Sequence, residues 1–176
     1  MKKLLINLVH PSLDKSIVNK RILDEISKLE NVTINNLYSE YPNFQIDTNK
    51  EQKLLLENDV IIFQFPMYWF SAPALLKEWF DTVLEAGFAH GGTYKLKDKS
   101  FTVAVSCGAE EKEYCEEGKE KKTVKEFLFP FYGISNYTKM DYKEPFITYE
   151  AEKGLSKETL NKYAQEYIKY IKKLSV

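Results

Sequence analysis

The sequence predicts a doubly wound α/β fold built on a parallel sheet. Predicted strands alternate with predicted helices along the chain, which is the order that a parallel sheet with helical crossovers requires. Two of the strands, Val60–Phe65 and Phe101–Ser106, are apolar in character, which indicates burial on both faces of the sheet. We find no internal repeat and no low-complexity linker, so residues 1–176 are expected to form one domain.

The N-terminal part of the chain forms a strand–loop–helix unit. Lys3–Val9 is predicted as a short buried strand and His10–Lys15 as a loop, after which Ser16 can cap a helix that runs to about Leu29. The apolar positions of this helix follow helical spacing: Ile17, Ile22, Ile26 and Leu29. Val32–Tyr38 then alternates between two sides, which suits an edge or near-edge strand.

The central part begins with a polar loop and a short helix from about Lys50 to Glu57, before the strand Val60–Phe65. Pro73 stands at a favourable first-turn position of the next helix, which extends to Ala86. One face of that helix is apolar: Leu75, Leu76, Trp79, Phe80, Val83 and Leu84. Gly87–Lys99 is expected to be a loop or a small hairpin.

The C-terminal part starts with the strand Phe101–Ser106 and its exit turn at Cys107–Ala109. Glu110–Lys122 carries charges of both signs and is predicted as a solvated loop without a binding role. The remaining elements are a helix from Thr123 to about Gly133, a last strand region in Tyr137–Tyr149, and a terminal helix that starts at Ser156. Leu160, Tyr163, Tyr167, Ile168 and Ile171 are expected to face inward from that last helix.

The overall charge excludes some classes of partner. With 25 basic and 26 acidic side chains the formal charge is -1, so no nucleic-acid footprint is expected. The apolar run after Met1 ends at Val9, which is too short for a secretory signal, and no stretch approaches a transmembrane length, so we expect a cytoplasmic protein. Cys107 and Cys115 lack the spacing of a zinc site and are expected to be reduced thiols, one of them buried at a strand end.

Three aromatic residues, Tyr68, Trp69 and Phe70, follow the strand Val60–Phe65 in a loop. They suit either a flat ligand or packing in the core or at a dimer interface. In a parallel sheet the ligand site lies beyond the carboxyl ends of the strands, and the loops after Val9, Phe65 and Ser106 should meet there. This convergence favours the ligand interpretation.

The loop that starts at His10 leads into a helix N-terminus, where free backbone amides and the helix dipole attract an anion such as phosphate. Ser16 and Asn19 add side-chain donors, although these two residues taken alone are better explained by helix capping, which needs no ligand. The seven glycines form neither a G-x-G-x-x-G motif nor a P-loop, and no nucleophile elbow supports a hydrolytic triad.

Three blocks of sequence together resemble one family. They are His10-Pro-x4-Ser16-x2-Asn19, the block FPMYWFSAPALLKEWF at 65–80, and Gly87-Phe-Ala-His-Gly91. The combination resembles the flavodoxin-like NAD(P)H:quinone oxidoreductases, above all their short bacterial branch. That branch includes general-stress NAD(P)H oxidoreductases and the ancillary proteins of glutathione-gated potassium efflux systems. The resemblance implies a flavodoxin-like, five-stranded, three-layer α/β/α fold.

The resemblance also implies roles for individual residues. The flavin phosphate would be held by His10, Ser16, Ile17, Val18 and Asn19. The isoalloxazine ring would be wrapped by Pro66, Met67, Tyr68, Trp69 and Phe70, and contacted on its other side by Ser106, Cys107, Gly108 and Ala109. Tyr114 would lie near flavin and substrate as a proton donor, and His90 would reach the pocket of the partner subunit in a homodimer. No metal site is implied.

The implied chemistry is two-electron transfer from NAD(P)H through tightly bound FMN to a quinone or similar acceptor. FAD is the alternative, used by relatives with a C-terminal extension that this chain is expected to lack. Two departures stand out: the third loop reads Ser106-Cys107-Gly108-Ala109 where Thr-Thr-Gly-Gly is common, and Glu120 stands where some members have a histidine. Two other functions remain open: a flavin-binding ancillary subunit associated with a membrane potassium efflux transporter, and a one-electron carrier.

Overall fold

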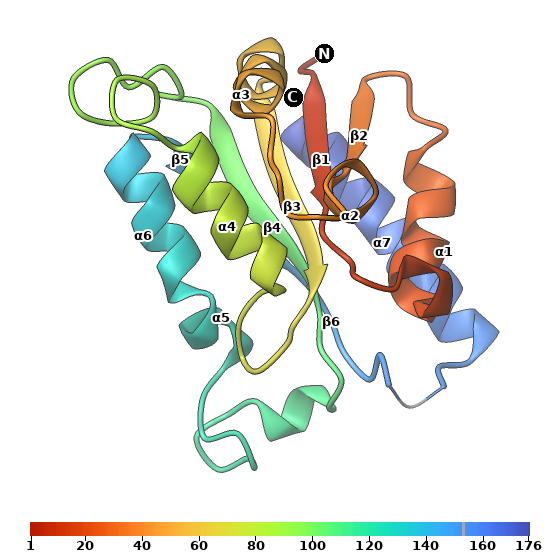
Figure 1. The fold of residues 1–176 in the computed structure, drawn as a ribbon. Helices are drawn as coiled ribbons and strands as arrows, with labels where there is room; N and C mark the ends of the chain where they lie inside the picture. Colours follow the sequence, from red (N-terminus) through yellow and green to blue (C-terminus); the bar gives the residue numbers. More distant parts are fainter. Residues whose placement is uncertain (153) are drawn as a thin grey trace.

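The computed structural model describes residues 1–152 and 154–176 and contains one parallel sheet (Figure 1). Its strands are β1 (Leu4–Leu8), β2 (Val32–Asn36), β3 (Val60–Pro66), β4 (Ser100–Ser106), β5 (Asp141–Tyr142) and β6 (Phe146–Thr148). The order is β2-β1-β3-β4-β5, and β6 also pairs with β4, so β5 and β6 are two segments of one interrupted edge. The predicted flavodoxin-like fold with about five parallel strands is confirmed.

Helices cover both faces of this sheet and produce three layers (Figure 1). One face is covered by α1 (Ile17–Ile26) and α7 (Lys157–Leu174), which also contact each other. The other face carries α3 (Thr48–Glu57), α4 (Ala74–Val83) and α6 (Phe129–Thr138). The remaining helical segments are short: η1 (Leu13–Lys15), α2 (Leu37–Glu40), η2 (Glu111–Glu113) and α5 (Val124–Phe127).

Side-chain caps begin most of these helices. Ser16 accepts a hydrogen bond from the Asn19 amide and starts α1, and Ser156 accepts one from the Thr159 amide and starts α7, as predicted. Asp47 caps α3 in the same way, so α3 starts at Thr48, two residues earlier than predicted. Each cap satisfies an amide that the first helical turn leaves without an acceptor.

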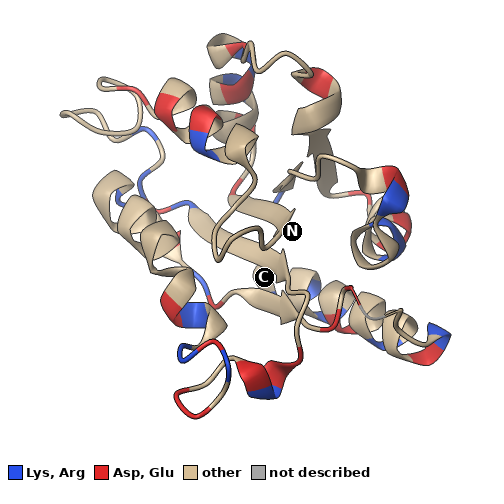
Figure 2. Cartoon of the chain, turned by 60° about the horizontal axis from the view of Figure 1, so that its bottom comes forward, with Lys and Arg blue, Asp and Glu red and all other residues tan. Residues whose placement is uncertain are grey.

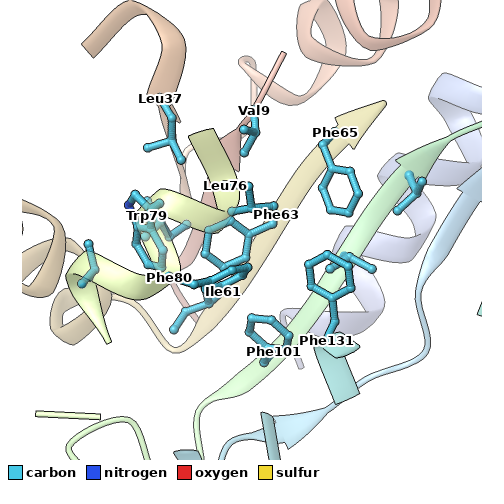
Figure 3. Packing of buried hydrophobic residues seen from close by; sticks show 14 of the residues in the cluster. Val9, Leu37, Ile61, Phe63, Phe65, Leu76, Trp79, Phe80, Phe101 and Phe131 are labelled. Atoms are coloured by element: carbon cyan, nitrogen blue, oxygen red, sulfur yellow. The ribbon is translucent and has the colours of Figure 1, made fainter. Parts of the chain in front are cut away.

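The core lies on both sides of the sheet because consecutive strand residues point to opposite faces. Facing α4 and α6, Phe63 packs against Trp79 and Phe80 with ring centroids 4.9 and 5.0 Å apart, and Phe65 stacks on Phe131 (Figure 3). The opposite face is mainly aliphatic: Leu4, Ile6, Val60, Ile62 and Ala104 pack against residues of α1 and α7. Every residue of β1, β3 and β4 is buried, as the sequence predicts for strands covered on two faces.

The structure differs from the predicted elements in several places. The helix α4 ends at Val83 instead of Ala86. The edge strand stops at Asn36 because the Asn36 side chain accepts from the Ser39 amide and starts α2. The helix predicted from Thr123 to about Gly133 is two helices, α5 and α6, because Pro130 has no backbone N–H to donate a hydrogen bond across the junction. The predicted strand region from Tyr137 is helical up to Thr138, and α1 ends at Ile26 instead of Leu29.

Acidic and basic positions are interspersed over the other long helices in Figure 2, whereas α6 and the loop between β3 and α4 carry neither. Within the described residues, no helix combines the length and the apolar character that a membrane span needs. The same residues contain no cluster of three His, Cys, Asp or Glu side chains suited to a metal ion.

Candidate functional site

Three strand-end loops meet around one cavity at the carboxyl edge of the sheet. The cavity has a volume of about 350 Å³ and lies where β1, β3 and β4 end, which is where ligands bind in open α/β sheets. Nine residues proposed from the sequence line it: His10, Ser16, Ile17, Asn19, Pro66, Met67, Tyr68, Ser106 and Gly108. Lys15, Ala151 and Glu152 complete the lining. The expected convergence of the three loops is therefore observed.

The β1 end of the cavity has the character of an anion site. It contains the N-terminus of α1, where the first-turn amides of Ile17 and Val18 have no acceptor within the helix. His10 Nδ1 accepts a hydrogen bond from the Ser12 amide at 3.1 Å, which leaves Nε2–H as the donor of a neutral ring. Burial lowers the pKa of His10, against a smaller opposite effect of Asp14. Ile17, which the resemblance places at the phosphate, is half exposed and lines the cavity.

Asn19 connects two of the loops and the central strand. Its side-chain amide Nδ2 donates to Ser16 Oγ at 3.2 Å and to Ser106 Oγ at 2.9 Å. Its Oδ1 accepts from Gln64 Nε2 at 3.2 Å. Asn19 is only 3% exposed, and the polar atoms of its side chain already make hydrogen bonds within the protein. Val18 is also buried and can offer only its backbone amide to a ligand.

The aromatic loop after β3 is a tight two-residue turn. Tyr68 and Ser71 exchange both backbone hydrogen bonds, at 2.9 and 3.0 Å, so Trp69 and Phe70 occupy the two central positions. Both central residues have positive φ, 49° for Trp69 and 60° for Phe70, a conformation that usually selects asparagine and glycine. Phe70 packs on Phe127 with centroids 4.9 Å apart, whereas Trp69 is 94% exposed. Neither side chain is part of the cavity lining.

The third loop turns its cysteine inward and its glycine toward the cavity. Cys107 is fully buried in the core, where burial raises the pKa of its thiol to about 12. A Cβ atom placed on Gly108 would lie 2.7 Å from the Glu152 carboxyl carbon, so any other residue there would displace the Glu152 side chain. Ala109 is partly buried and packs against the core cluster beside α4 and α6.

Tyr114 folds back onto this third loop. Its hydroxyl lies beside the Cys107 thiol and bonds to the Ala109 backbone, and its ring lies 5.9 Å from that of Tyr149. Burial, followed by the neighbouring Cys107, raises the pKa of Tyr114 to about 12, so the hydroxyl keeps its proton at neutral pH. Tyr114 is nearly buried and does not line the cavity within this chain.

His90 is separated from the cavity. It lies in the loop between α4 and β4, at the end of the sheet opposite the strand-end loops (Figure 1), and its ring packs 5.1 Å from Tyr137 of α6. A larger, open hollow of about 1080 Å³ lies at that opposite edge, lined by both chain ends and several lysines. It contains none of the strand-end loops, so we place the functional site at the smaller cavity.

Some residues around the cavity were not predicted. Lys15 and Glu152 bring one positive and one negative charge to it, and no motif singled them out. Gln64 could have been found, because it is the one polar residue in the strand Val60–Phe65. A buried amide inside an apolar strand calls for a hydrogen-bonding explanation.

Comparisons with known proteins agree with this architecture. Residues 2–171 match the Flavodoxin_2 family, described as having a flavodoxin-like fold. An uncharacterized NAD(P)H oxidoreductase, YrkL, from Bacillus subtilis is 43% identical over 171 residues, 97% of this chain and 98% of its own. The potassium-efflux ancillary protein KefG from Yersinia pestis is 38% identical over 96% of this chain and 93% of its own.

A solved structure shares both the fold and the sequence. General stress protein 14 from Treponema denticola, solved in complex with FMN, superposes with a TM-score of 0.93. It is 36% identical, and the match covers 98% of this chain and 99% of that one. On the sheet order, the position of the cavity and these matches, the chain belongs to the Flavodoxin_2 family.

Proposed function

We propose that this protein is an FMN-dependent NAD(P)H oxidoreductase that passes two electrons from NAD(P)H to a quinone or a similar small acceptor. The observation that carries the proposal is that the N-terminus of α1, which suits an anion, and Tyr68 of the aromatic turn line one cavity. FMN has a matching phosphate and a flat ring. FMN is favoured over FAD because the similar Treponema denticola protein was solved with FMN.

The donors around the cavity fit the phosphate end of FMN. The α1 N-terminus, His10 Nε2–H, Lys15 and the Ser16 hydroxyl favour a negative group there. The resemblance assigned Ser106 to the ring, but its hydroxyl shares the Asn19 Nδ2 donor with Ser16, so we place it at the phosphate end as well. The Glu152 carboxylate lines the same cavity and opposes an anion, so the phosphate is expected at the Ser16 end, with the ring toward Tyr68. The proposed binding residues Ile17, Val18, Pro66, Gly108 and Ala109 would act mainly through their backbone. The amides of Met67 and Cys107 already donate to the carbonyls of Ser106 and Thr148.

The chemistry that bound FMN supplies is two-electron transfer between NAD(P)H and the acceptor. The protein would position both. The backbone amides of Trp69 and Phe70 take no part in the two bonds that close the turn, so they can donate to the polar edge of a ring. The Tyr114 hydroxyl, protonated at neutral pH, would donate to an acceptor oxygen once the third loop opens it to the site.

The test of this proposal is the visible spectrum of the purified protein, with the mass of any flavin released on denaturation. We expect a flavin spectrum, or reconstitution by added FMN, and NAD(P)H-dependent reduction of a quinone. Trp69→Ala should weaken flavin retention and turnover together. A colourless protein that takes up neither FMN nor FAD would overturn the proposal.

We further propose a homodimer formed through the outer face of α5 and α6. Aromatic side chains follow one another along this face: Phe70 on Phe127, then Phe129 beside Tyr132, then Tyr137 beside His90. Phe129, Tyr132 and Tyr137 are all exposed, which is unusual for a free surface. Because the face runs from the cavity end to the His90 end, antiparallel packing of two copies would bring His90 of one copy toward the cavity of the other.

The dimer has a direct test. Sedimentation should give twice the chain mass for the wild type, and Phe129→Glu should shift the mass toward the monomer. If that variant and the wild type are both monomeric, the role of His90 in a neighbouring site is wrong.

A second function is favoured by the KefG similarity: an ancillary subunit of a membrane potassium efflux transporter, with flavin binding supporting association. Both functions suit a cytoplasmic protein because NAD(P)H is an intracellular reductant. We also take residues 1–176 as one flavin-binding domain, since β1 to β6 share one sheet and α7 packs on α1. Recovery of the protein in the membrane fraction only when the transporter is present would support the ancillary function.

A further inference from the structure

The interior of the site contains a chain of hydrogen bonds that starts at Gln64, outside the cavity. Gln64 lies in β3 between Leu8 of β1 and Ala104 of β4 and is 1% exposed. Its Nε2 donates to Asn19 Oδ1, and Asn19 Nδ2 donates to both Ser16 Oγ and Ser106 Oγ. The chain therefore runs from the middle of the sheet to two hydroxyls that line the cavity.

The direction of this chain determines what the two hydroxyls can do. Ser16 Oγ accepts from Asn19 twice, through the backbone amide and through Nδ2, each at 3.2 Å. Ser106 Oγ accepts from Asn19 Nδ2 at 2.9 Å. A serine hydroxyl has one proton and two lone pairs, so an oxygen that already accepts has its proton available for another acceptor. Both protons are therefore free to be donated to a ligand in the cavity.

Burying the Gln64 side chain in the apolar strand β3 is energetically unfavourable, and nothing in its packing compensates for this. Among the described residues Gln64 Oε1 is a buried oxygen without a hydrogen-bond partner. Leaving a buried acceptor unpaired destabilises the folded protein, and the neighbours of Gln64 in β3 are apolar. Rotating the amide would place its oxygen against Asn19 Oδ1, which also accepts, so Nε2 must face Asn19 while Asn19 keeps its present orientation.

We propose that Gln64 is a positioning residue. It holds the Asn19 amide in the orientation that lets Ser16 and Ser106 donate their hydroxyl protons to the phosphate-bearing end of the cofactor. This inference rests on the proposed FMN site. If the Asn19 side-chain amide were rotated the other way, Asn19 Oδ1 would accept from the two serine hydroxyls, and their protons would point away from the cavity. Gln64 thus sets the preference of the site for an anion without touching it.

The test compares Gln64→Leu with a matched control, Thr102→Val. Thr102 is a buried polar residue on the same face of the neighbouring strand, and its hydroxyl bonds to the Lys143 and Glu144 carbonyls and to Tyr170, away from the cavity. Gln64→Leu should weaken binding of FMN at least about tenfold, as expected for lost hydrogen bonds to a charged group. Thr102→Val should change FMN binding less than about twofold, although both variants lose stability.

A double-mutant cycle separates positioning from a general structural effect. Ser16→Gly with Ser106→Ala removes both hydroxyls, and glycine keeps most of the capping stability of α1. In that background Gln64→Leu should weaken FMN binding by less than about twofold, because its effect passes through the missing hydroxyls. An equal loss in both backgrounds, or equal effects of Gln64→Leu and Thr102→Val, would overturn the inference.

Inorganic phosphate, measured by isothermal titration on the same variants, distinguishes this inference from the proposed function. If phosphate binding depends on Gln64 but FMN does not bind, the positioning role stands and the flavin assignment fails. If the wild type binds neither FMN nor phosphate, the donor-lined anion site itself is wrong. If FMN binds equally to the wild type and to Gln64→Leu, the flavin assignment stands and the positioning role is wrong.

Discussion

The Trp69–Phe70 turn should store conformational strain that can be measured as stability. A left-handed conformation costs a residue with a Cβ atom about 1–2 kcal/mol, and Trp69 has φ 49°. Trp69 is 94% exposed, so replacing it removes almost no buried surface. Trp69→Ala keeps the Cβ atom and the strain, whereas Trp69→Gly removes both at a smaller cost in unfolded-chain entropy, of about 0.5–1 kcal/mol.

We therefore expect Trp69→Gly to be more stable than Trp69→Ala by about 1 kcal/mol, or about 2–4 °C in Tm for a chain of this size. Thermal unfolding of the flavin-free protein is the assay. Tyr137 provides the control, because it is exposed in α6 with ordinary helical geometry. At position 137 the order of stability should reverse, with Tyr137→Gly about 1 kcal/mol less stable than Tyr137→Ala. Equal stability of the two Trp69 variants, or a more stable alanine variant, would refute the strain argument.

Three further predictions concern buried polar groups. Glu51→Gln should destabilise the protein by about 2–4 kcal/mol in urea denaturation with FMN affinity unchanged, because the buried Glu51 carboxylate accepts from Asn35, Tyr41 and Trp79. Tyr114→Phe should lower quinone turnover about tenfold or more with normal flavin content; loss of flavin would instead make Tyr114 a binding residue. The unfolded chain takes up a proton on His10 near pH 6.5, before the folded protein does, so this residue makes stability fall as pH drops below about 6.5. His10→Asn should therefore show a weaker decline of Tm between pH 7 and 5 than the wild type. An equal decline in both proteins would contradict the lowering of the His10 pKa by burial.

The central elements of the fold were predictable from local patterns. β3 and β4 are buried on both faces, and their apolar composition shows this directly. The caps of α1 and α7 were recognised from Ser16 and Ser156, since a serine before an amphipathic segment satisfies the orphan amides of a first helical turn. The parallel arrangement of the strands then brings their loops to one edge, which is why the cavity was expected where it lies.

Other features depended on contacts between distant segments. The split of the edge into β5 and β6 follows from two separate pairings with β4. His90 and the aromatic turn belong to neighbouring sequence blocks, yet α4 carries the chain to the opposite end of the sheet before His90 is reached.

The amino-acid sequence by itself determined the alternation of strands and helices, the edge at which a ligand site must lie, and nine of the residues that line it. The alternation and the edge follow from periodicity, capping and strand direction, which are local properties, whereas the nine residues were assigned to the site through the family resemblance. Only the tertiary structure decided that the Asn19 side chain is hydrogen-bonded to Gln64, Ser16 and Ser106, that Cys107 faces the core, and that Trp69 has a left-handed backbone conformation. The physical reason is that hydrogen-bond partners and burial are set by neighbours distant in sequence, and spacing along the chain does not reveal them.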